Sequence, residues 1–401
     1  MDYQQENNVW VIGHKNPDTD SICAAICYAN LKNRLQDGFH YIPKRAGSIN
    51  EETKYVLQHF GVEPPEYAED AGAQVKDIAF RRTAGVSGHI SLKKAWELMK
   101  TENVMTLAVT SASDKLEGLI ITGDIAESYM DVYDNHILSR ARTQYKNIVE
   151  TLNGTLLAGN EHAYFLRGKV VVATGSRDVI EECIESDDLV IVGDRDETHI
   201  CALEENASCM VVTGGTQVSA QVLEMANRRD CVVIITPYDT FTAARLINQS
   251  MPIKYFMKKE NFVTFDIDDY VDEVREVMSK KRHRDFPVLD DQRRYLGMVS
   301  RRNLLNMHKK KLILVDHNEK SQAIDGIEGA EILEIIDHHR LGSLETMSPV
   351  FFRNQPLGCT ATIIYQMYQE QNVEIDAKIA GLLCSAILSD TLMYRSPTCT
   401  P

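Results

Sequence analysis

The sequence predicts an α/β protein in which one parallel-sheet domain is interrupted by inserted modules. Two apolar runs, Val9–Ile12 and Leu312–Val315, are typical of strands buried on both faces of a parallel sheet. Each run leads directly into ionisable residues, although the two runs lie near opposite ends of the chain. Between them, residues 68–308 follow a different pattern that contains an internal repeat. These observations favour one α/β domain built from both ends of the chain.

The composition is that of an acidic globular protein. The 401 residues include 43 basic and 58 acidic side chains, which gives a formal net charge of −15. Such a surface repels nucleic acid and anionic lipid, so we expect neither as a partner. It also repels anionic small substrates unless bound cations reverse the local field. No apolar run approaches the ~20 residues needed to cross a bilayer, and no signal peptide is evident, so we expect a cytoplasmic protein.

The nine cysteines predict no disulfide framework. Their number is odd, and none forms a Cys-x-x-Cys pair. Cys23 and Cys27 lie four residues apart on a predicted helix, and we interpret them as buried small apolar residues.

The first distinctive stretch is His-Lys-Asn-Pro-Asp-Thr-Asp-Ser, residues 14–21, which follows the strand predicted at Val9–Ile12. Helical spacing of apolar residues begins after it. His14, Asp18 and Asp20 therefore lie where a strand passes into a helix, at the sheet edge where open α/β folds bind ligands. This mixed nitrogen and oxygen set suits Mn²⁺, Mg²⁺ or Fe²⁺. Taken alone, the stretch is also compatible with a helix N-terminus whose aspartates act as cap and dipole partners.

The chain divides into five predicted segments. Residues 1–67 begin the α/β domain, and residues 309–401 complete it. Residues 68–136 and 250–308 each show a helix followed by two strands, and this shared order indicates a repeat. The first repeat has its helix at Ile90–Lys100, with Leu92, Ala95, Trp96 and Met99 on one face. Residues 137–249 alternate strands and helices and form a separate α/β segment.

The repeated unit resembles the CBS pair, a module that binds adenosine nucleotides between its halves. In the second copy, Gly-Met-Val-Ser-Arg-Arg-Asn, residues 297–303, matches the family's Gly-h-h-(Ser/Thr)-x-x-(Asn/Asp) signature. The resemblance implies that Ser300 and Asn303 hold ribose or phosphate. In the first copy the corresponding stretch keeps Asp124 but has an isoleucine at the hydroxyl position, with Thr122 one place later.

A basic turn precedes the second strand of the second copy. Arg282, His283 and Arg284 lie there, and arginines in such a position can meet phosphate charge. A solvated basic turn is the alternative. Related modules are expected to carry Tyr at position 283, so His283 is a departure that bears on adenine stacking. The resemblance implies AMP, ADP, ATP or diadenosine polyphosphates as ligands, and a homodimer because CBS pairs usually dimerise.

The segment between the copies resembles the DRTGG domain, an α/β module found between CBS copies. The likeness rests on Val-Val-Thr-Gly-Gly, residues 211–215. The glycine pair is compatible with a phosphate contact and equally with a tight turn, so we assign the segment no chemistry.

Further candidate ligands follow apolar runs in the C-terminal part. In chain order they are Asp316, Asp337, His338, His339 and Asp390. A single Asp after a strand is usually a cap, but consecutive histidines together with several carboxylate sites have few structural explanations. Asp316 and Asp390 are placed to bridge two cations about 3.5–4 Å apart. The remaining ligands divide between the two cations. His14 and Asp18 complete one shell, and Asp20 and His338 complete the other.

Four motifs now resemble the DHH phosphoesterase superfamily, in the family's order. They are Gly-His-Lys-Asn-Pro-Asp-Thr-Asp-Ser (13–21), Val-Asp-His-Asn (315–318), Asp-His-His-Arg (337–340) and Ser-Asp-Thr (389–391). They are most similar to the manganese-dependent family II inorganic pyrophosphatases. RecJ nucleases and oligonucleotide phosphodiesterases favour Asp-x-Asp-Gly in the first motif. With its insert, the sequence resembles the nucleotide-regulated, CBS-containing subfamily: a parallel-sheet DHH catalytic domain interrupted by a CBS pair with a DRTGG-like α/β insert.

The resemblance implies hydrolysis of pyrophosphate to two phosphates. It implies two or more Mn²⁺ ions, with Mg²⁺ or Co²⁺ as possible substitutes, that activate a shared water near neutral pH. His339 is expected to contact the leaving phosphate and to protonate it. Asp337 is expected to orient an imidazole, with a purely structural role as the alternative.

In one respect the sequence departs from this family. The family continues past Ser-Pro-Thr-Cys-Thr, residues 396–400, into a second catalytic domain of the DHHA2 type whose Lys and Arg residues clamp the substrate. This sequence stops at Pro401. Phosphoryl transfer depends on charge stabilisation, so we expect this chain to bind Mn²⁺ and to hydrolyse pyrophosphate weakly.

Two alternatives stay open. One is a DHH-type phosphodiesterase acting on nucleotides or short oligonucleotides, and the other is an adenine-nucleotide sensor whose catalytic half is vestigial. A preference for pyrophosphate over a cyclic dinucleotide would argue against the phosphodiesterase. Measuring adenine-nucleotide binding together with hydrolytic activity would distinguish a sensor from a regulated enzyme.

Overall fold

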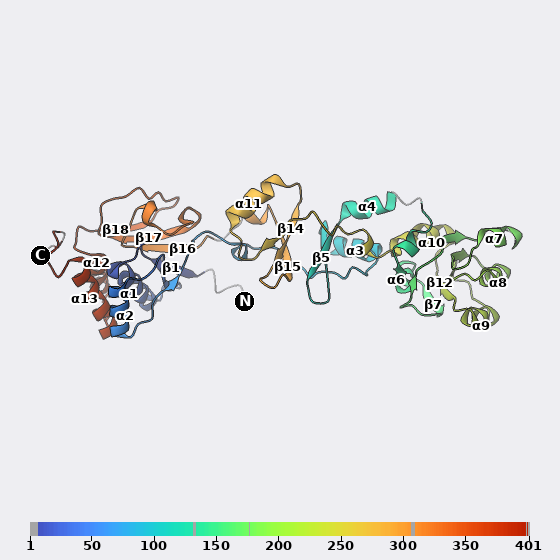
Figure 1. Cartoon of the computed structure of the whole chain (residues 1–401), viewed down its shortest axis with the longest axis horizontal. Helices are drawn as coiled ribbons and strands as arrows, with labels where there is room; N and C mark the ends of the chain where they lie inside the picture. The colour runs from blue at the N-terminus through green and yellow to red at the C-terminus, as the bar shows by residue number, and fades with distance from the viewer. Residues whose placement is uncertain (1–6, 131–133, 176, 306–308, 398, 400–401) are drawn as a thin grey trace. The chain divides into compact units, whose positions relative to one another are not determined.

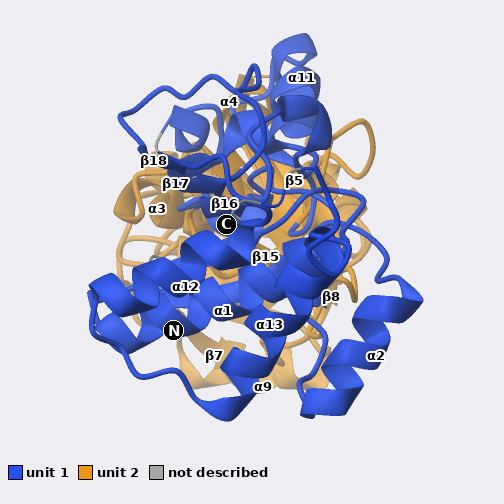
Figure 2. Ribbon diagram, turned by 90° about the vertical axis from the view of Figure 1, so that its left-hand side faces the viewer, with its two compact units in different colours: residues 1–80, 267–284, 300–401 blue, residues 81–266, 285–299 orange. Residues whose placement is uncertain are grey.

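The computed structural model describes residues 7–130, 134–175, 177–305, 309–397 and 399 (Figure 1). The chain divides into two compact units, which Figure 2 colours separately. The first unit consists of Met1–Phe80, Ile267–Arg284 and Ser300–Pro401, and the second of Arg81–Asp266 and Asp285–Val299.

A six-stranded sheet in the first unit joins the two ends of the chain. Its strand order is β18-β17-β16-β1-β2-β3, and its strand pairs are parallel. The strands are β1 (Asn8–Ile12), β2 (His40–Arg45), β3 (Glu66–Tyr67), β16 (Lys311–Val315), β17 (Glu331–Asp337) and β18 (Phe351–Asn354). Because β1 pairs directly with β16, placing Val11 opposite Ile313, the interrupted α/β domain is confirmed.

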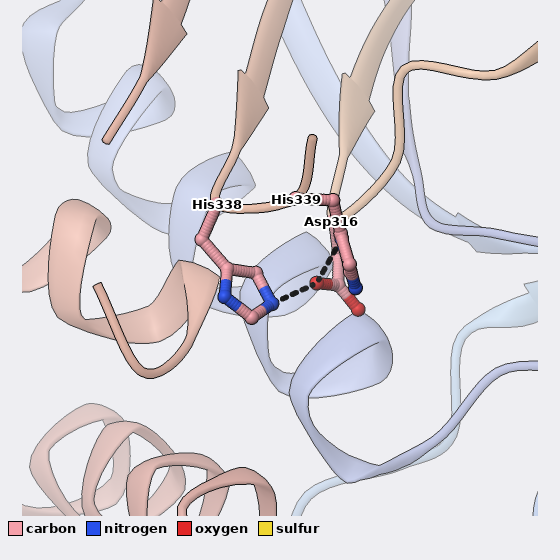
Figure 3. Close-up of side chains that lie close together, drawn as sticks. All are labelled: Asp316, His338 and His339. Carbon is pink, nitrogen blue, oxygen red and sulfur yellow. Dashed lines mark ion pairs between the residues drawn. The ribbon is translucent and has the colours of Figure 1, made fainter. Parts of the chain in front are cut away.

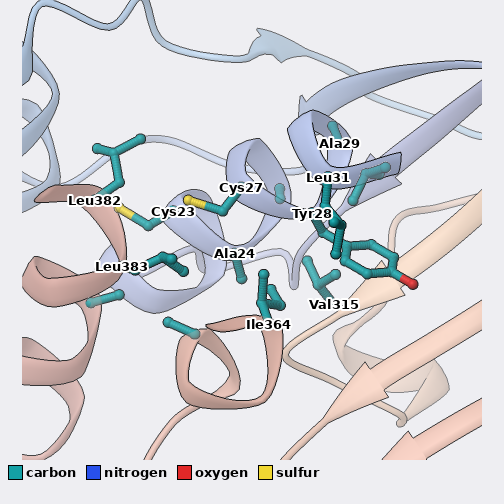
Figure 4. Close-up of a cluster of buried hydrophobic side chains, with 14 of the residues drawn as sticks. Cys23, Ala24, Cys27, Tyr28, Ala29, Leu31, Val315, Ile364, Leu382 and Leu383 are labelled. Carbon is teal, nitrogen blue, oxygen red and sulfur yellow. The ribbon is translucent and has the colours of Figure 1, made fainter. Parts of the chain in front are cut away.

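Four helices cover one face of this sheet region: α1 (Thr19–Leu35), α2 (Glu51–Phe60), α12 (Thr360–Glu370) and α13 (Ala377–Asp390). The helix α1 begins at Thr19, shortly before the predicted helical pattern, and the Asp18 side chain caps it by accepting a hydrogen bond from the Ser21 amide. It packs against α12 and α13 in a continuous apolar core (Figure 4). Cys23 and Cys27 lie fully buried in that core, and burial raises the pKa of both thiols. Their interpretation as small apolar residues is thus confirmed.

The two faces of β16 serve different cores, as the alternation of side chains along a strand requires. Ile313 and Val315 belong to the helical core. Leu312 and Leu314 pack instead with Ala323 and Ile324, which follow the short turn η5 (Lys320–Gln322), and with Ile327 of η6 (Ile327–Gly329). The central strand is therefore buried on both faces, which explains its unbroken apolar run.

The two chain segments that lead into and out of the inserted residues 68–308 are hydrogen-bonded to the first unit. The Ala71 amide donates to the Asp325 carbonyl at 2.7 Å on the outgoing side, ahead of η1 (Val75–Asp77). On the returning side, Lys310 donates through Nζ to the Gly72 carbonyl at 2.8 Å. Both connections consequently lie next to each other beside the sheet.

The second unit contains a five-stranded sheet in the order β7-β12-β11-β10-β9. Its strands are β7 (Thr155–Ala158), β9 (Val170–Val172), β10 (Leu189–Val192), β11 (Cys209–Val212) and β12 (Val232–Ile235). The strands β9 to β12 are parallel, and β7 joins antiparallel. The connecting helices are α7 (Arg177–Cys183), α8 (Asp196–Glu204) and α9 (Ala220–Arg228). This is the separate α/β segment that the sequence predicts.

Smaller elements complete the segment and its boundaries. They are α5 (Ile137–Arg140), β6 (Thr143–Gln144), α6 (Tyr145–Thr151), β8 (Tyr164–Phe165), α10 (Thr240–Leu246), η2 (Ile247–Ser250) and η3 (Ile253–Tyr255).

The two predicted repeats share an element order. The first has α3 (Leu92–Thr101), β4 (Thr106–Thr110), β5 (Leu116–Ile121) and α4 (Thr122–Met130). The second has β13 (Phe265–Asp266), α11 (Val271–Lys280), β14 (Asp285–Leu289), β15 (Tyr295–Ser300) and η4 (Asn303–Leu305). Strands of both copies share a small core that includes Leu119 and Met298.

The predicted buried face of α3 is partly wrong. Leu92, Ala95 and Met99 are buried, but Trp96 is 45% exposed. The spacing i, i+3, i+7 defines the buried stripe, and Trp96 lies at its margin.

Candidate metal centre

The site lies where the order of the large sheet reverses. Chain order runs outward in both directions from the pair β1 and β16, so the carboxyl ends of these strands flank a topological switch point. His14 follows β1, Asp316 follows β16, and His338 follows β17. Three separate segments therefore deliver ionisable side chains to the same edge of the sheet.

One group of potential ligands consists of His14, Asp18 and Asp316. Their nearest ligand atoms all lie within 4.8 Å of one another. The His14 Nε2 atom is 3.4 Å from Asp316 Oδ2 and 3.7 Å from Asp18 Oδ2. The sequence predicts His14 and Asp18 in one shell with Asp316 as a shared ligand, and the structure places these three side chains together.

A second group consists of Asp20, His338 and Asp390, with the same 4.8 Å limit between ligand atoms. His338 Nε2 is 3.4 Å from Asp390 Oδ2. Asp390 is the last residue of α13, and Asp20 lies in the first turn of α1 rather than in the preceding loop. The structure thus brings Asp20 and His338 together as predicted.

Asp316 connects the two groups. Its Oδ2 atom faces His14, while its Oδ1 atom lies 3.5 Å from His338 Nε2 and 3.9 Å from His339 Nδ1 (Figure 3). Its backbone has φ 63°, a left-handed conformation that aspartate tolerates better than most residues. Asp390 belongs to the second group alone, so its use as a second bridge stays a prediction.

The carboxylates of the site are crowded together, and the charged groups that face them are imidazoles. Burial and the charges of Asp316 and Asp390 raise the pKa of Asp20 well above its usual value. Burial likewise raises the pKa of Asp390 to about 6, against the opposing charge of His338. Burial also opposes ionisation of Asp316, but contacts with His14 and His338 outweigh it and lower the pKa of Asp316.

The histidines respond in the opposite sense. Burial disfavours the charged form of His14, yet its hydrogen bonds to Asp18 and Asp316 raise its pKa to about 10. Burial is likewise outweighed at His338, where Asp316 raises the pKa to about 9. Both imidazoles are therefore protonated near neutral pH when carboxylates are their only partners.

The donor set fits divalent cations. Within the described residues, every ion pair found for Asp18, Asp316 and Asp390 is with a histidine and none is with Lys or Arg. His338 Nδ1 lies 3.0 Å from the Leu357 carbonyl, which orients the ring and leaves Nε2 for a ligand bond. Buried carboxylates and imidazoles that lack cationic partners suit Mn²⁺ or a similar ion.

His339 is held beside this cluster by Asp337. The Asp337 carboxylate is fully buried, and its Oδ1 atom lies 2.9 Å from His339 Nδ1. The same oxygen accepts the amides of His338 and His339 at 2.8 Å and 3.1 Å. The Asn318 side-chain amide donates to the other Asp337 oxygen. The hydrogen bond that His339 makes to Asp337 raises the pKa of His339, whose side chain is 49% exposed.

The predicted nucleotide residues fall in both units. Ser300 donates to Asn303 Oδ1 through its amide at 2.8 Å and its hydroxyl at 2.6 Å. In the first copy, the Ile121 amide donates to Asp124 Oδ2 at 2.8 Å, which is the same local bond. This shared turn supports the repeat assignment.

The other predicted nucleotide residues are less constrained. Thr122 begins α4 in the second unit, whereas Arg282, His283 and Arg284 are exposed in the first unit. Their roles as nucleotide ligands stay predictions.

Sequence reasoning missed two residues of the site. Thr360 donates from its hydroxyl to Asp316 Oδ1 at 3.0 Å and from its amide to Asp20 Oδ2 at 2.6 Å. Asn318 secures Asp337 and also donates to the Arg340 carbonyl at 2.9 Å. Asn318 stood inside a recognised motif without a role, whereas no local signal distinguishes Thr360 from an ordinary helix start.

Comparison with protein families identifies the inserted segments. The DRTGG domain matches residues 147–250, and the CBS domain matches residues 253–309. A crystal structure of the CBS and DRTGG domains of the regulatory region of Clostridium perfringens pyrophosphatase, complexed with the activator diadenosine tetraphosphate, is similar to this chain. It has a TM-score of 0.55 and 36% identity, and covers 57% of this chain and 100% of that one.

Relatives extend the likeness over almost the whole chain. The cobalt-dependent inorganic pyrophosphatase of Clostridium perfringens is 42% identical over 393 residues, which are 98% of this chain and 71% of that protein. A probable manganese-dependent inorganic pyrophosphatase of Thermotoga maritima is 38% identical, with the same coverage. The manganese-dependent inorganic pyrophosphatase of Bacillus subtilis is 56% identical over 89 residues, or 22% of this chain and 29% of its own length. The chain therefore belongs to the family II metal-dependent inorganic pyrophosphatases, among those that carry CBS and DRTGG domains.

Proposed function

We propose that this chain hydrolyses pyrophosphate at the site formed by the two ligand groups, with one divalent cation in each. The observation that carries the proposal is the position of Asp316, whose two carboxylate oxygens face His14 and His338. A carboxylate shared in this way sets the short spacing between ions that two-metal phosphoryl transfer requires. Family membership supports the reaction, because the relatives are named as inorganic pyrophosphatases.

The side chains divide the work of the reaction. Bound divalent cations supply Lewis-acid charge and lower the pKa of a coordinated water. His14 and Asp18 would hold one ion, and Asp20, His338 and Asp390 the other. Asp316 lies against both groups and would be the ligand that they share. Asp20 and Asp316 are buried, so bulk water is excluded from these two carboxylates.

His339 is the candidate proton donor to the leaving phosphate. Its ring is partly exposed and lies next to Asp316, so it can reach a substrate bound over the cations. Asp337 holds Nδ1 and thereby presents Nε2 outward. The hydrogen bond to Asp337 also raises the pKa of His339, which favours the protonated imidazole that a general acid requires.

Manganese or cobalt is the proposed cofactor, and Mg²⁺ is a possible substitute. The mixed imidazole and carboxylate donors accept all three ions. The names of the relatives include both manganese-dependent and cobalt-dependent enzymes, so the choice between these ions rests on measurement with this chain.

The direct test is phosphate release with defined substrates. We expect Mn²⁺-dependent release from pyrophosphate and little cleavage of a cyclic dinucleotide or a short oligonucleotide. Asp20→Ala removes a ligand of the second group and is expected to abolish binding of one ion and most turnover. Preferential cleavage of a phosphodiester would support the phosphodiesterase alternative, and retention of both ions by Asp20→Ala would contradict the ligand assignment.

We further propose that adenine nucleotides regulate this activity through the CBS copies. The support is the similarity to the activator-bound Clostridium perfringens regulatory region, together with the equivalent turns at Asp124 and Asn303. A ligand changes activity only if it binds two states of the protein with different affinity. Calorimetry with AMP, ATP and diadenosine tetraphosphate tests this, with Arg282→Gln expected to weaken binding. Nucleotide binding without any effect on turnover would favour the sensor alternative.

A homodimer in the cytoplasm completes the proposal. Among the described residues, no helix has the length and apolar character needed to cross a bilayer. Sedimentation analysis measures the oligomeric state directly.

A further inference from the structure

The N-terminus of α12 is built into the metal centre. Cys359, its cap residue, makes no side-chain capping bond. The carboxylate of Asp20 takes that place instead, accepting the Thr360 amide at 2.6 Å and the Ala361 amide at 3.0 Å. Asp20 is 1% exposed and Thr360 is fully buried. A ligand of the second group is thus fixed by backbone donors that no side-chain substitution at position 360 removes.

The Thr360 side chain has a separate role. Its hydroxyl donates to Asp316 Oδ1 at 3.0 Å. This oxygen faces the second group, 3.5 Å from His338 Nε2, while Oδ2 faces His14 at 3.4 Å. A carboxylate oxygen has two lone pairs, so Oδ1 can accept the hydroxyl and still bind a cation.

We propose that Thr360 is a positioning residue of the two-cation site: its hydroxyl fixes the rotation of the Asp316 carboxylate so that each oxygen faces a different cation. Without this donor, rotation of the carboxylate would let both oxygens serve one ion and leave the other short of a ligand. The inference rests on the two-cation site proposed above. It extends that site to a residue that does not itself bind metal.

Two substitutions at position 360 separate the effect of the hydroxyl from that of the side-chain shape. Thr360→Val keeps the branched shape and the backbone amide that holds Asp20, but removes the donor. Thr360→Ser keeps the donor and removes a methyl group. The control is Thr362→Val, two residues along the same helix, whose hydroxyl lies 3.1 Å from Cys359 Sγ and is not bonded to a ligand.

The test is Mn²⁺ titration of the full chain by calorimetry, together with electron paramagnetic resonance of the loaded protein. We expect the unaltered chain, Thr360→Ser and Thr362→Val to bind two ions that give an exchange-coupled spectrum. We expect Thr360→Val to bind the second ion at least tenfold more weakly, with loss of the coupled signal. Thr360→Ala, in which a good helix former replaces Thr360, is expected to behave likewise and covers the case in which the valine variant does not fold.

The outcomes separate the two proposals. If the unaltered chain binds only one ion, the two-cation site itself is wrong. If it binds two and Thr360→Val and Thr360→Ala also bind two with unchanged affinity and coupling, the positioning role of Thr360 is wrong. Equal loss in Thr360→Ser and Thr360→Val would also overturn that role, because the hydroxyl would then not be the cause.

Discussion

At the scale of single residues, the site depends on side chains whose preferred charge states conflict until cations bind. Asp20 is pushed toward its neutral form by burial and by Asp316, whereas His14 and His338 are pushed toward their charged forms. Divalent ions need the reverse, ionised carboxylates and neutral imidazoles. Metal binding must therefore expel protons from this cluster.

The first prediction concerns those protons. At pH 8, His14 and His338, whose pKa values are raised to about 10 and about 9, are protonated without metal. Binding of two Mn²⁺ ions should then release at least about two protons, one from each ring. The apparent affinity should rise as pH increases toward 9, because less work is needed to deprotonate the rings. Calorimetry in buffers of different ionisation enthalpy counts the protons, and an affinity independent of pH from 6 to 9 would contradict the proposed ligands.

The second prediction concerns the support of His339. Asp337→Asn keeps the shape of the side chain but removes the charge that holds His339 Nδ1. Substitution of such an orienting carboxylate typically costs about 10–100-fold. Because Asp337 bonds His339 directly, we expect this loss in turnover, with Mn²⁺ affinity changed only a few-fold. Steady-state kinetics and Mn²⁺ titration of one preparation measure turnover and metal affinity separately. An equal loss of turnover and of Mn²⁺ affinity would identify a structural role for Asp337.

At the scale of elements, the turns beside the sheet hold the connection to the insert. Gly326 precedes η6 and has φ 72°, and a Cβ atom there would lie 1.8 Å from Asp70 Oδ1 and 2.4 Å from the Gly72 amide. Asp70 and Gly72 belong to the outgoing connection. This position therefore requires glycine for its conformation and for the close approach of the chain.

The third prediction follows from that contact. Gly326→Ala should lower the free energy of unfolding of the first unit by ~1–2 kcal/mol from backbone strain alone, with the steric clash adding to the loss. Gly329→Ala is the matched control, since its Cβ would meet only Gly72 Cα at 3.7 Å. Differential scanning calorimetry measures both. Equal transition temperatures for the two variants would show that the segment containing Asp70 and Gly72 can move to accept the methyl group without loss of stability.

The elements also show what the sequence could and could not predict. Buried strands at Val9–Ile12 and Leu312–Val315 were predictable because strands covered on both faces must be apolar throughout. Periodicity wrongly predicted Trp96 to be buried. The width of the buried stripe on a helix depends on the element that packs against it, which the sequence of the helix does not reveal. Thr360 was not predictable, since its importance comes from Asp20 and Asp316, which reach it from elements far away in sequence.

At the scale of the whole molecule, the sheet of the first unit is formed by strands from both ends of the chain. The strands β1 and β16 pair across the inserted segment, and the two connections are joined where Lys310 bonds the Gly72 carbonyl. The metal ligands all come from residues 14–20 and 316–390. Neither the sheet nor the ligand groups draw a residue from the insert, so the insert is not needed to build the metal centre.

The fourth prediction is made at this scale. A chain in which residues 74–308 are replaced by a short Gly-Ser linker should fold and bind two Mn²⁺ ions. It should show no response to adenine nucleotides, because the proposed ligands Ser300 and Asn303 are absent. Circular dichroism and metal titration provide the check. A folded but metal-free protein would show that the insert shapes the metal site.

The central claim is that two cations share Asp316. Anomalous diffraction from a crystal of the Mn²⁺-loaded chain tests this most directly. We predict two manganese peaks about 3.5–4 Å apart, one beside His14 and Asp18 and one beside Asp20 and His338, with Asp316 touching both. A single peak, or two peaks without a common carboxylate ligand, would contradict it.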